Sequence, residues 1–285
     1  MQFCAGCSER EQRKRDTTMF KTTVIAIASC AGMASVSLAG GVNVLADANS
    51  TATFDTNSGQ ISWLVDGVEQ IFAQDFFFRR ASDTREYRVD DVNLSLDGIF
   101  TSDTNPFTDT SHDALAQLYS DGNGLQIETL FTLRGGTAGS SNADLAEQIT
   151  IRNTSNASMS LSFFQFVDFD LGGDFSDDAG QIVNGNTAQQ ADNDFSVAET
   201  VVTPSPTLFQ MSNAVLMNAF LNDNNVDNLD GSSSFAGDVG WAFQWDITLA
   251  AGDSFLISKN KSVVPAPGSL ALLAGASLLG TRRRR

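Results

Sequence analysis

Apolar and polar residues alternate in several runs along the middle of the chain, and this pattern predicts β-strands. In the clearest run, apolar residues occupy every second position from Trp241 to Leu249. Because successive side chains of a strand point to opposite faces, one face of this strand is expected to be continuously apolar. The same alternation runs from Leu125 to Leu133 and from Val92 to Leu96.

Turn signals separate these runs at short intervals. Asp121-Gly122-Asn123-Gly124 joins two apolar runs and predicts a tight hairpin. Helical patterns are confined to residues 144–148 and 214–221, and residues 222–238 are typical of a loop. Many short strands with few helices indicate an all-β fold. We therefore predict a single large antiparallel β-sandwich over residues 40–262, with about 12 to 16 strands from ordinary strand and loop lengths.

The first part of the chain has the pattern of a secretory signal. Lys21 precedes a mostly apolar stretch over residues 22–36, and Ser37-Leu38-Ala39 is a small-x-small cleavage site. The order of these parts predicts a signal peptide over 19–39, cleaved between Ala39 and Gly40. The alternative is a buried helix at the start of the domain. Residues 1–18 are polar, which indicates either a true start at Met19 or an unusually long charged segment before the signal.

The end of the chain carries a second pattern in three parts. Residues 263–280 are uncharged and include Pro265-Ala266-Pro267, and the chain ends on Arg282, Arg283, Arg284 and Arg285. Arginines beside an apolar segment favour the cytoplasmic side, so the preceding domain is expected outside. An ordinary tail anchor is the alternative.

This tail, residues 263–285, resembles the PEP-CTERM sorting signal. The family's usual Pro-Glu-Pro appears here as Pro265-Ala266-Pro267, a form similar to planctomycete-type tails. The resemblance implies an exosortase-like processing enzyme as partner, transient membrane association, and release or attachment at the cell surface. It also implies association with exopolysaccharide. It implies nothing about the fold or activity of the middle of the chain.

The charge distribution argues against a nucleic-acid partner. The formal net charge is −17, and nine of the 17 basic residues lie at or before Lys21 or in the terminal arginine run. The middle of the chain therefore keeps eight basic residues and is strongly acidic, so it repels phosphates. All three cysteines precede the predicted cleavage site, which leaves no thiol or disulfide for the folded part.

Few side chains suggest catalysis. The single histidine, His112, is expected in a surface loop, because Ser111-His112-Asp113 on one segment cannot converge as a triad. Three tryptophans, Trp63, Trp241 and Trp245, fall in alternating strands and are predicted to be core residues. Tyr87 and Tyr119 are expected to be exposed.

Carboxylates are the remaining candidates. Asp168 and Asp170 follow an aromatic run, and on a strand they would share one face. Two carboxyl groups on one face suit a glycosidase or a calcium site. Asp223 and Asp227 resemble the start of a calcium loop and are further candidate ligands. Solvated acidic loops are the alternative at both places, and no other cofactor is predicted.

From the residues and the resemblance together we predict an exported, non-enzymatic protein of the cell surface or extracellular matrix, associated with polysaccharide. The alternative is a carbohydrate-binding or carbohydrate-active β-sandwich that uses Asp168 and Asp170.

Overall fold

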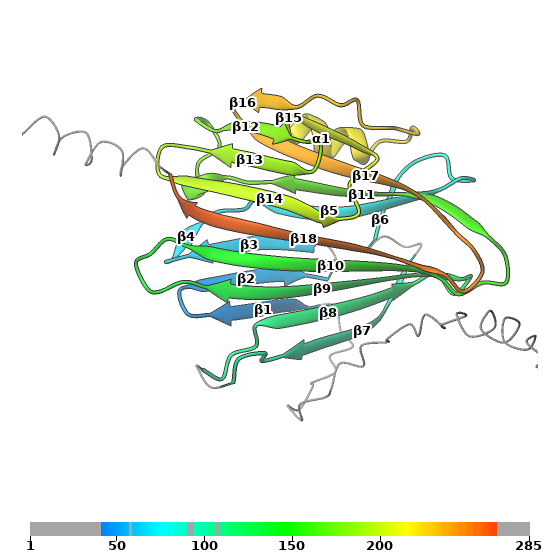
Figure 1. Ribbon diagram of the computed structural model, residues 1–285, viewed down its shortest axis with the longest axis horizontal. Helices are drawn as coiled ribbons and strands as arrows, with labels where there is room; N and C mark the ends of the chain where they lie inside the picture. Colours follow the sequence, from blue (N-terminus) through cyan, green and yellow to red (C-terminus); the bar gives the residue numbers. More distant parts are fainter. Residues whose placement is uncertain (1–40, 57–58, 90–93, 107–108, 267–285) are drawn as a thin grey trace, which may run out of the picture. The chain divides into compact units, whose positions relative to one another are not determined.

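The computed structural model describes residues 41–56, 59–89, 94–106 and 109–266, which form 18 strands, one α-helix and one 3-10 turn. The strands make two antiparallel sheets of nine strands each, shown in Figure 1. The prediction of an all-β antiparallel sandwich is confirmed. The number of strands exceeds the predicted 12 to 16 because β4, β6 and β16 contain only two or three residues each.

Sheet B has the order β1-β2-β3-β5-β11-β17-β15, with β4 paired to β3 and β6 paired to β5. Its strands are β1 (Val42–Asp47), β2 (Ser50–Asp55), β3 (Gly59–Val65), β4 (Val68–Glu69), β5 (Ala73–Arg80), β6 (Tyr87–Arg88), β11 (Met159–Asp168), β15 (Leu208–Asn213) and β17 (Val239–Leu249).

Sheet A has the order β16-β12-β13-β14-β18-β10-β9-β8-β7. Its strands are β7 (Ser95–Ser102), β8 (Ala114–Ser120), β9 (Leu125–Gly135), β10 (Ala143–Asn153), β12 (Ala179–Val183), β13 (Thr187–Ala191), β14 (Phe195–Thr203), β16 (Ser234–Ala236) and β18 (Ser254–Pro265). Figure 1 shows the last strand, β18, running between β14 and β10.

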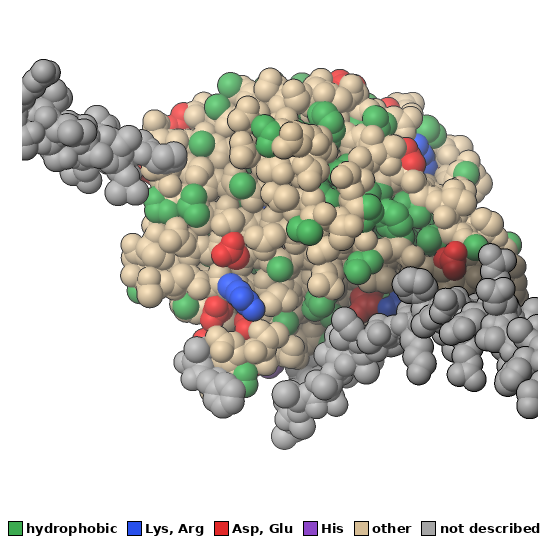
Figure 2. Space-filling model, in the orientation of Figure 1, with side chains coloured by type: hydrophobic (Ala, Val, Ile, Leu, Met, Phe, Trp, Pro, Cys, Tyr) green, Lys and Arg blue, Asp and Glu red, His purple; other side chains and the backbone are tan. Residues whose placement is uncertain are grey.

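The core lies between the two sheets and is rich in aromatic rings. The three tryptophans are buried, which confirms their prediction as core residues. Phe169 and Trp241 stack with centroids 5.4 Å apart, and Phe163 stacks on Phe76 at 5.8 Å. The exposure expected for Tyr119 is wrong: it lies on β8 and its ring faces this core. Figure 2 shows that the hydrophobic side chains on the visible outer face form only small, scattered groups.

The predicted helix at 214–221 is confirmed as α1 (Ala214–Leu221). Asn213 caps it, because its side-chain oxygen accepts a hydrogen bond from the backbone N–H of Leu216. Met217 and Leu221 pack with Phe164 and Phe166 in a second apolar cluster on the outer side of sheet B. β11 and β17 are therefore buried on both faces, which explains their nearly continuous apolar sequence.

The helical turn predicted at 144–148 is wrong. These residues lie inside β10, which pairs with β9 on one side and β18 on the other. Ala, Leu, Glu and Gln favour a helix locally, but hydrogen bonds along two complete ladders outweigh that preference.

The folded part continues past residue 262. Pro265 pairs with Phe195, and the backbone N–H of Ala266 donates to the oxygen of Asp194 at 2.8 Å. Two of the three residues of the Pro265-Ala266-Pro267 motif thus lie at the end of β18 or directly after it. The predicted signal peptide, its cleavage site at Ala39 and Gly40, Pro267 and the arginine run lie outside the described residues. Within the described part of the chain, no helix has the length and apolar character needed to span a membrane.

Candidate functional site

Three carboxyl groups converge at one end of the sandwich. Asp168, Asp170 and Asp238 each place a carboxylate oxygen within 4.8 Å of those of the other two. Asp168 is the most buried, with 7% of its surface exposed, whereas Asp170 and Asp238 are half-buried. The structure therefore brings together Asp168 and Asp170, as the sequence predicts, and adds Asp238, which sequence reasoning missed. We call these three residues the acidic cluster.

Strand pairing explains why the cluster forms. β11 and β17 pair antiparallel with Asp168 opposite Gly240, so the same register continued would place Asp170 opposite Asp238. Asp170 itself lies beyond the end of β11. Gly172 and Gly173, both at positive φ, turn the chain back, and the N–H of Gly173 donates to the backbone carbonyl oxygen of Asp170 at 2.9 Å.

Burial and mutual repulsion dominate the electrostatics of the cluster. Burial raises the pKa of Asp168 to about 8, and the charges of Asp170, Asp238 and Asp178 contribute to this rise. Burial also raises the pKa of Asp170, with added repulsion from Asp238. Oδ1 of Asp168 has no hydrogen-bond partner among the described residues. The cluster thus holds three carboxyl groups whose negative charges repel one another.

The cluster lacks a positive partner within the described part of the chain. The ion pairs of Lys and Arg go to other acids, and none reaches Asp168, Asp170 or Asp238. One neutral donor is present, since Nδ2 of Asn213 donates to Oδ2 of Asp238 at 3.2 Å. The three carboxyl groups of the acidic cluster can either accept hydrogen bonds from a polyhydroxyl ligand or hold a cation.

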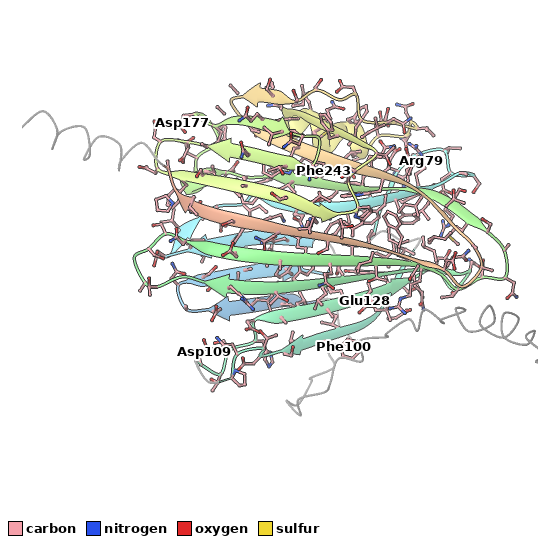
Figure 3. All side chains as sticks on the ribbon, in the orientation of Figure 1. Arg79, Phe100, Asp109, Glu128, Asp177 and Phe243 are labelled. Carbon is pink, nitrogen blue, oxygen red and sulfur yellow. The ribbon has the colours of Figure 1, made fainter. Side chains whose placement is uncertain are left out.

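Two exposed phenylalanines lie close in the chain to residues of the cluster or are joined to them through the backbone. The backbone N–H of Phe72 donates to the backbone carbonyl oxygen of Asp168 at 3.0 Å, and 65% of Phe72 is exposed. Phe175 is also exposed and follows Asp174, whose charge acts on Asp170. The segment between β11 and β12, residues 169–178, is called the acidic loop. Figure 3 labels Asp177 of this loop at one end of the sandwich and Arg79 at the other.

A hollow of about 540 Å³ lies across β12, β13, β14 and β18. Its lining consists largely of small, amide and hydroxyl side chains, including Gln181, Gln189 and Ser262. One lining residue, Ala179, directly follows Asp178, the last residue of the acidic loop, in the chain. The volume is within the range of small-molecule sites, about 300 to 1,000 Å³.

Comparison with known proteins gives similarity of fold only. No family model matches the chain, and no curated protein matches it. A bacterial glucoamylase solved with acarbose aligns with a TM-score of 0.55 at 8% identity, over 84% of this chain and 34% of that chain. This chain therefore spans about a third of the glucoamylase.

Two further solved structures align less well. A galactose mutarotase-like protein from Lactobacillus casei gives a TM-score of 0.47 at 11% identity, over 79% of this chain and all of that one. A Klebsiella pneumoniae protein named as an aldose 1-epimerase gives 0.48 at 8% identity, over 88% of each chain.

These findings correct the prediction of a non-enzymatic surface or matrix protein. The sandwich shares its fold with part of a glucoamylase solved with acarbose, and this likeness of fold speaks against the non-enzymatic reading without identifying an activity. The sequence misled because the fold joins residues that are far apart in the chain. Asp238 is 70 residues from Asp168, and no local motif connects them.

The other predicted residues lie apart from the cluster. Asp223 accepts hydrogen bonds from the backbone and side chain of Asn225, and Arg79 donates to the backbone carbonyl oxygen of Asp227. Neither belongs to a group of three or more metal-ligating side chains within the described residues, where the acidic cluster is the one such group. His112 is exposed in a loop, as predicted.

A second group of charged residues lies inside the sandwich. Lys259 and Lys261 of β18 form ion pairs with Glu147 of β10, and Lys259 also pairs with Glu199 of β14 at 2.9 Å. All four are buried. Burial alone would raise the pKa of Glu147, but the two ammonium groups outweigh it and hold that pKa below its usual value. We call these four residues the buried ion network.

The stability of the protein is expected to depend on pH through Asp168. Its pKa rises from 3.8 in the unfolded chain to about 8 in the folded protein. The free energy of unfolding is therefore unaffected by titration of this group below about pH 4, and it falls as the pH rises toward about 8, because the unfolded state releases the proton first. The free energy of unfolding of the wild type, minus that of Asp168→Asn, should therefore fall over this range in buffer without divalent cations. Urea unfolding at several pH values measures this difference. The exposed Asp253→Asn variant should show a flat difference, and a rising difference for Asp168→Asn would contradict the expectation.

Proposed function

We propose that the protein is a carbohydrate-active protein whose sugar site is the acidic cluster with Phe72. The observation that carries this proposal is the convergence of Asp168, Asp170 and Asp238, with the exposed Phe72 joined to Asp168 by a backbone hydrogen bond. Carboxylates accept hydrogen bonds from the hydroxyl groups of a sugar. An exposed ring stacks on the apolar C–H face of a sugar, so the two features recognise complementary sides of one ligand.

The surroundings support a ligand of more than one sugar unit. The hollow across β12, β13, β14 and β18 is lined by Ala179, which directly follows the acidic loop in the chain, and it offers amide and hydroxyl groups. Glycoside hydrolysis also uses a pair of carboxyl groups, which flank the glycosidic bond that is cleaved. The fold shared with part of a glucoamylase agrees with this proposal but does not identify the sugar or the reaction.

A sugar panel tests the proposal. We expect calorimetry to detect binding of at least one mono- or oligosaccharide to the full chain. We also expect the protein either to change the optical rotation of a sugar solution or to release reducing ends from an oligosaccharide. Phe72→Ala and Asp170→Asn should each weaken binding about tenfold, which corresponds to about 1.4 kcal/mol. Phe100→Ala is the matched control, because Phe100 is 45% exposed on the distant edge strand β7 (Figure 3).

Two results would contradict the proposal. One is a folded protein that neither binds nor converts any sugar of the panel. The other is equal binding by the wild type and by the Phe72 and Asp170 variants, since the ligand would then sit elsewhere.

A further inference from the structure

We infer that the acidic cluster is a calcium site, with Asp168, Asp170 and Asp238 as its protein ligands. This inference goes beyond the proposed function, because the cation binds whether or not a sugar does. It concerns the same three carboxylates, so the experiments below separate the two proposals.

The geometry of the cluster suits one cation. The three carboxylate oxygens lie within 4.8 Å of one another. Calcium–oxygen distances are about 2.3 to 2.6 Å, so two ligands on opposite sides of one ion stand up to about 5 Å apart. Three oxygens gathered this closely can ligate one such ion together. Magnesium demands near-ideal octahedral geometry and keeps several of its waters, so three carboxylates from two strand ends and a loop suit the more adaptable calcium better.

An independent observation points to a cationic ligand. Asp168 is more than nine-tenths buried, and its Oδ1 is without a hydrogen bond although it belongs to a carboxyl group aimed at two others. A buried polar atom of this kind is normally satisfied by protein, water or an ion. Asp178 is also buried, and its charge acts on Asp168. A divalent cation satisfies the free oxygen and cancels this repulsion in one step.

The chemistry of the ligands selects the ion. All three are carboxylates, which suit the hard cations calcium, magnesium and manganese, whereas zinc and copper sites take imidazole or thiolate. Rigid elements hold two of the ligands: Asp168 ends β11, and Asp238 directly precedes β17. Asp170 lies on the loop that the two glycines turn back, so it can adjust to the ion. Calcium accepts six to eight oxygens, and waters or sugar hydroxyls can fill the remaining positions.

Calorimetric titration of the full chain with calcium chloride tests the inference. We expect one site per chain with a dissociation constant of about 0.1 to 1 mM, as in extracellular calcium modules, and a rise in melting temperature on addition of calcium. Magnesium chloride should bind at least tenfold more weakly. Asp168→Asn and Asp238→Asn should each weaken calcium binding at least tenfold.

Control variants distinguish ion binding at the cluster from general screening of the acidic surface. Asp253→Asn removes an exposed acid from the β17–β18 turn and should leave the calcium response unchanged. Asp170→Asn changes a half-buried loop residue, so it provides a folded ligand variant if either strand-end variant fails to fold. Without calcium, Asp168→Asn should melt at or above the wild-type temperature, because repulsion within the cluster is reduced.

Several outcomes would overturn the inference. These are the absence of heat and of any melting shift with calcium, or an equal shift in the wild type and the Asp170 variant. A loss of the response in Asp253→Asn as large as in Asp168→Asn would indicate general screening of an acidic surface. Calcium binding without sugar binding would support the metal site and contradict the proposed function alone. Sugar binding in the presence of a chelator, together with no response to calcium, would support the proposed function and contradict the metal site.

Discussion

Replacement of Glu199 by alanine is expected to lower the free energy of unfolding by about 3 to 5 kcal/mol. Oε1 of Glu199 accepts hydrogen bonds from Lys259 at 2.9 Å and from Gln165 at 2.7 Å. Oε2 accepts from the indole N–H of Trp241 at 2.8 Å. Because all these donors are buried, alanine leaves an ammonium, an amide and an indole N–H with fewer partners and without access to water. Urea unfolding measures the change.

Two variants show whether the cost comes from burial. Glu128→Ala removes a glutamate of β9 on the outer face of sheet A (Figure 3). Its ion pair with Arg152 is half-exposed, so its loss should cost at most about 1 kcal/mol. Lys259→Met combined with Glu199→Gln removes both charges and keeps a hydrogen-bonding side chain at residue 199. It should cost less than Glu199→Ala alone. Equal losses in Glu199→Ala and Glu128→Ala would show that the network is solvated.

Replacement of Phe163 by alanine is the second large effect, also about 3 to 5 kcal/mol. Phe163 lies at the centre of β11, is fully buried, and has its ring centroid 5.8 Å from that of Phe76 and 6.2 Å from that of Trp245. Phe163 points from β11 toward sheet A, and β11 is fixed by hydrogen-bond ladders to β5 and β17. The side chains around Phe163 therefore cannot fill the cavity left by alanine without moving whole strands.

The same denaturation series provides the comparison. Phe163→Leu retains most of the side-chain volume and should cost clearly less than alanine. Phe100→Ala, on the exposed edge strand, should stay within about 0.5 kcal/mol of the wild type. If Phe163→Ala also stayed within that range, the two sheets would not be packed through this ring.

Local patterns of apolar and polar residues predicted the elements that depend only on residues adjacent in the chain. The run from Trp241 to Leu249 forms β17, the Asp121–Gly124 turn joins β8 to β9, and residues 214–221 form α1. The helical turn predicted at residues 144–148 is wrong because their local helix preference is overridden by pairing to β18, which is more than a hundred residues away in the chain. Sequence alone does not contain that pairing.

The buried ion network had a signal that the sequence analysis missed. On β18, Ile257, Lys259, Lys261 and Val263 occupy alternate positions, so both lysines must face the side that the aliphatic residues face. Each glutamate occupies the same kind of position. Glu147 lies between Leu145 and Ile149, and Glu199 lies between Val197 and Val201. Charged residues at inward positions of three strands therefore indicate that those strands are neighbours.

The acidic cluster was predicted in part. Asp168 and Asp170 are close in the chain, so their proximity follows from local spacing. Asp238 joins them only through the register of β11 on β17, and Phe72 only through a backbone hydrogen bond from the loop before β5. The pKa of Asp168 also depends on burial, which composition does not reveal.

The central place of β18 in sheet A determines the order in which the chain can fold during synthesis. Until Ser254–Pro265 have left the ribosome, β14 and β10 have no partner for one edge each, and the carboxylates of Glu147 and Glu199 have no lysine to neutralise them. Long-range pairing of this kind makes folding slow. The last described strand thus acts as the closing step of folding, and a chain stalled before residue 254 would expose two unpaired edges to aggregation.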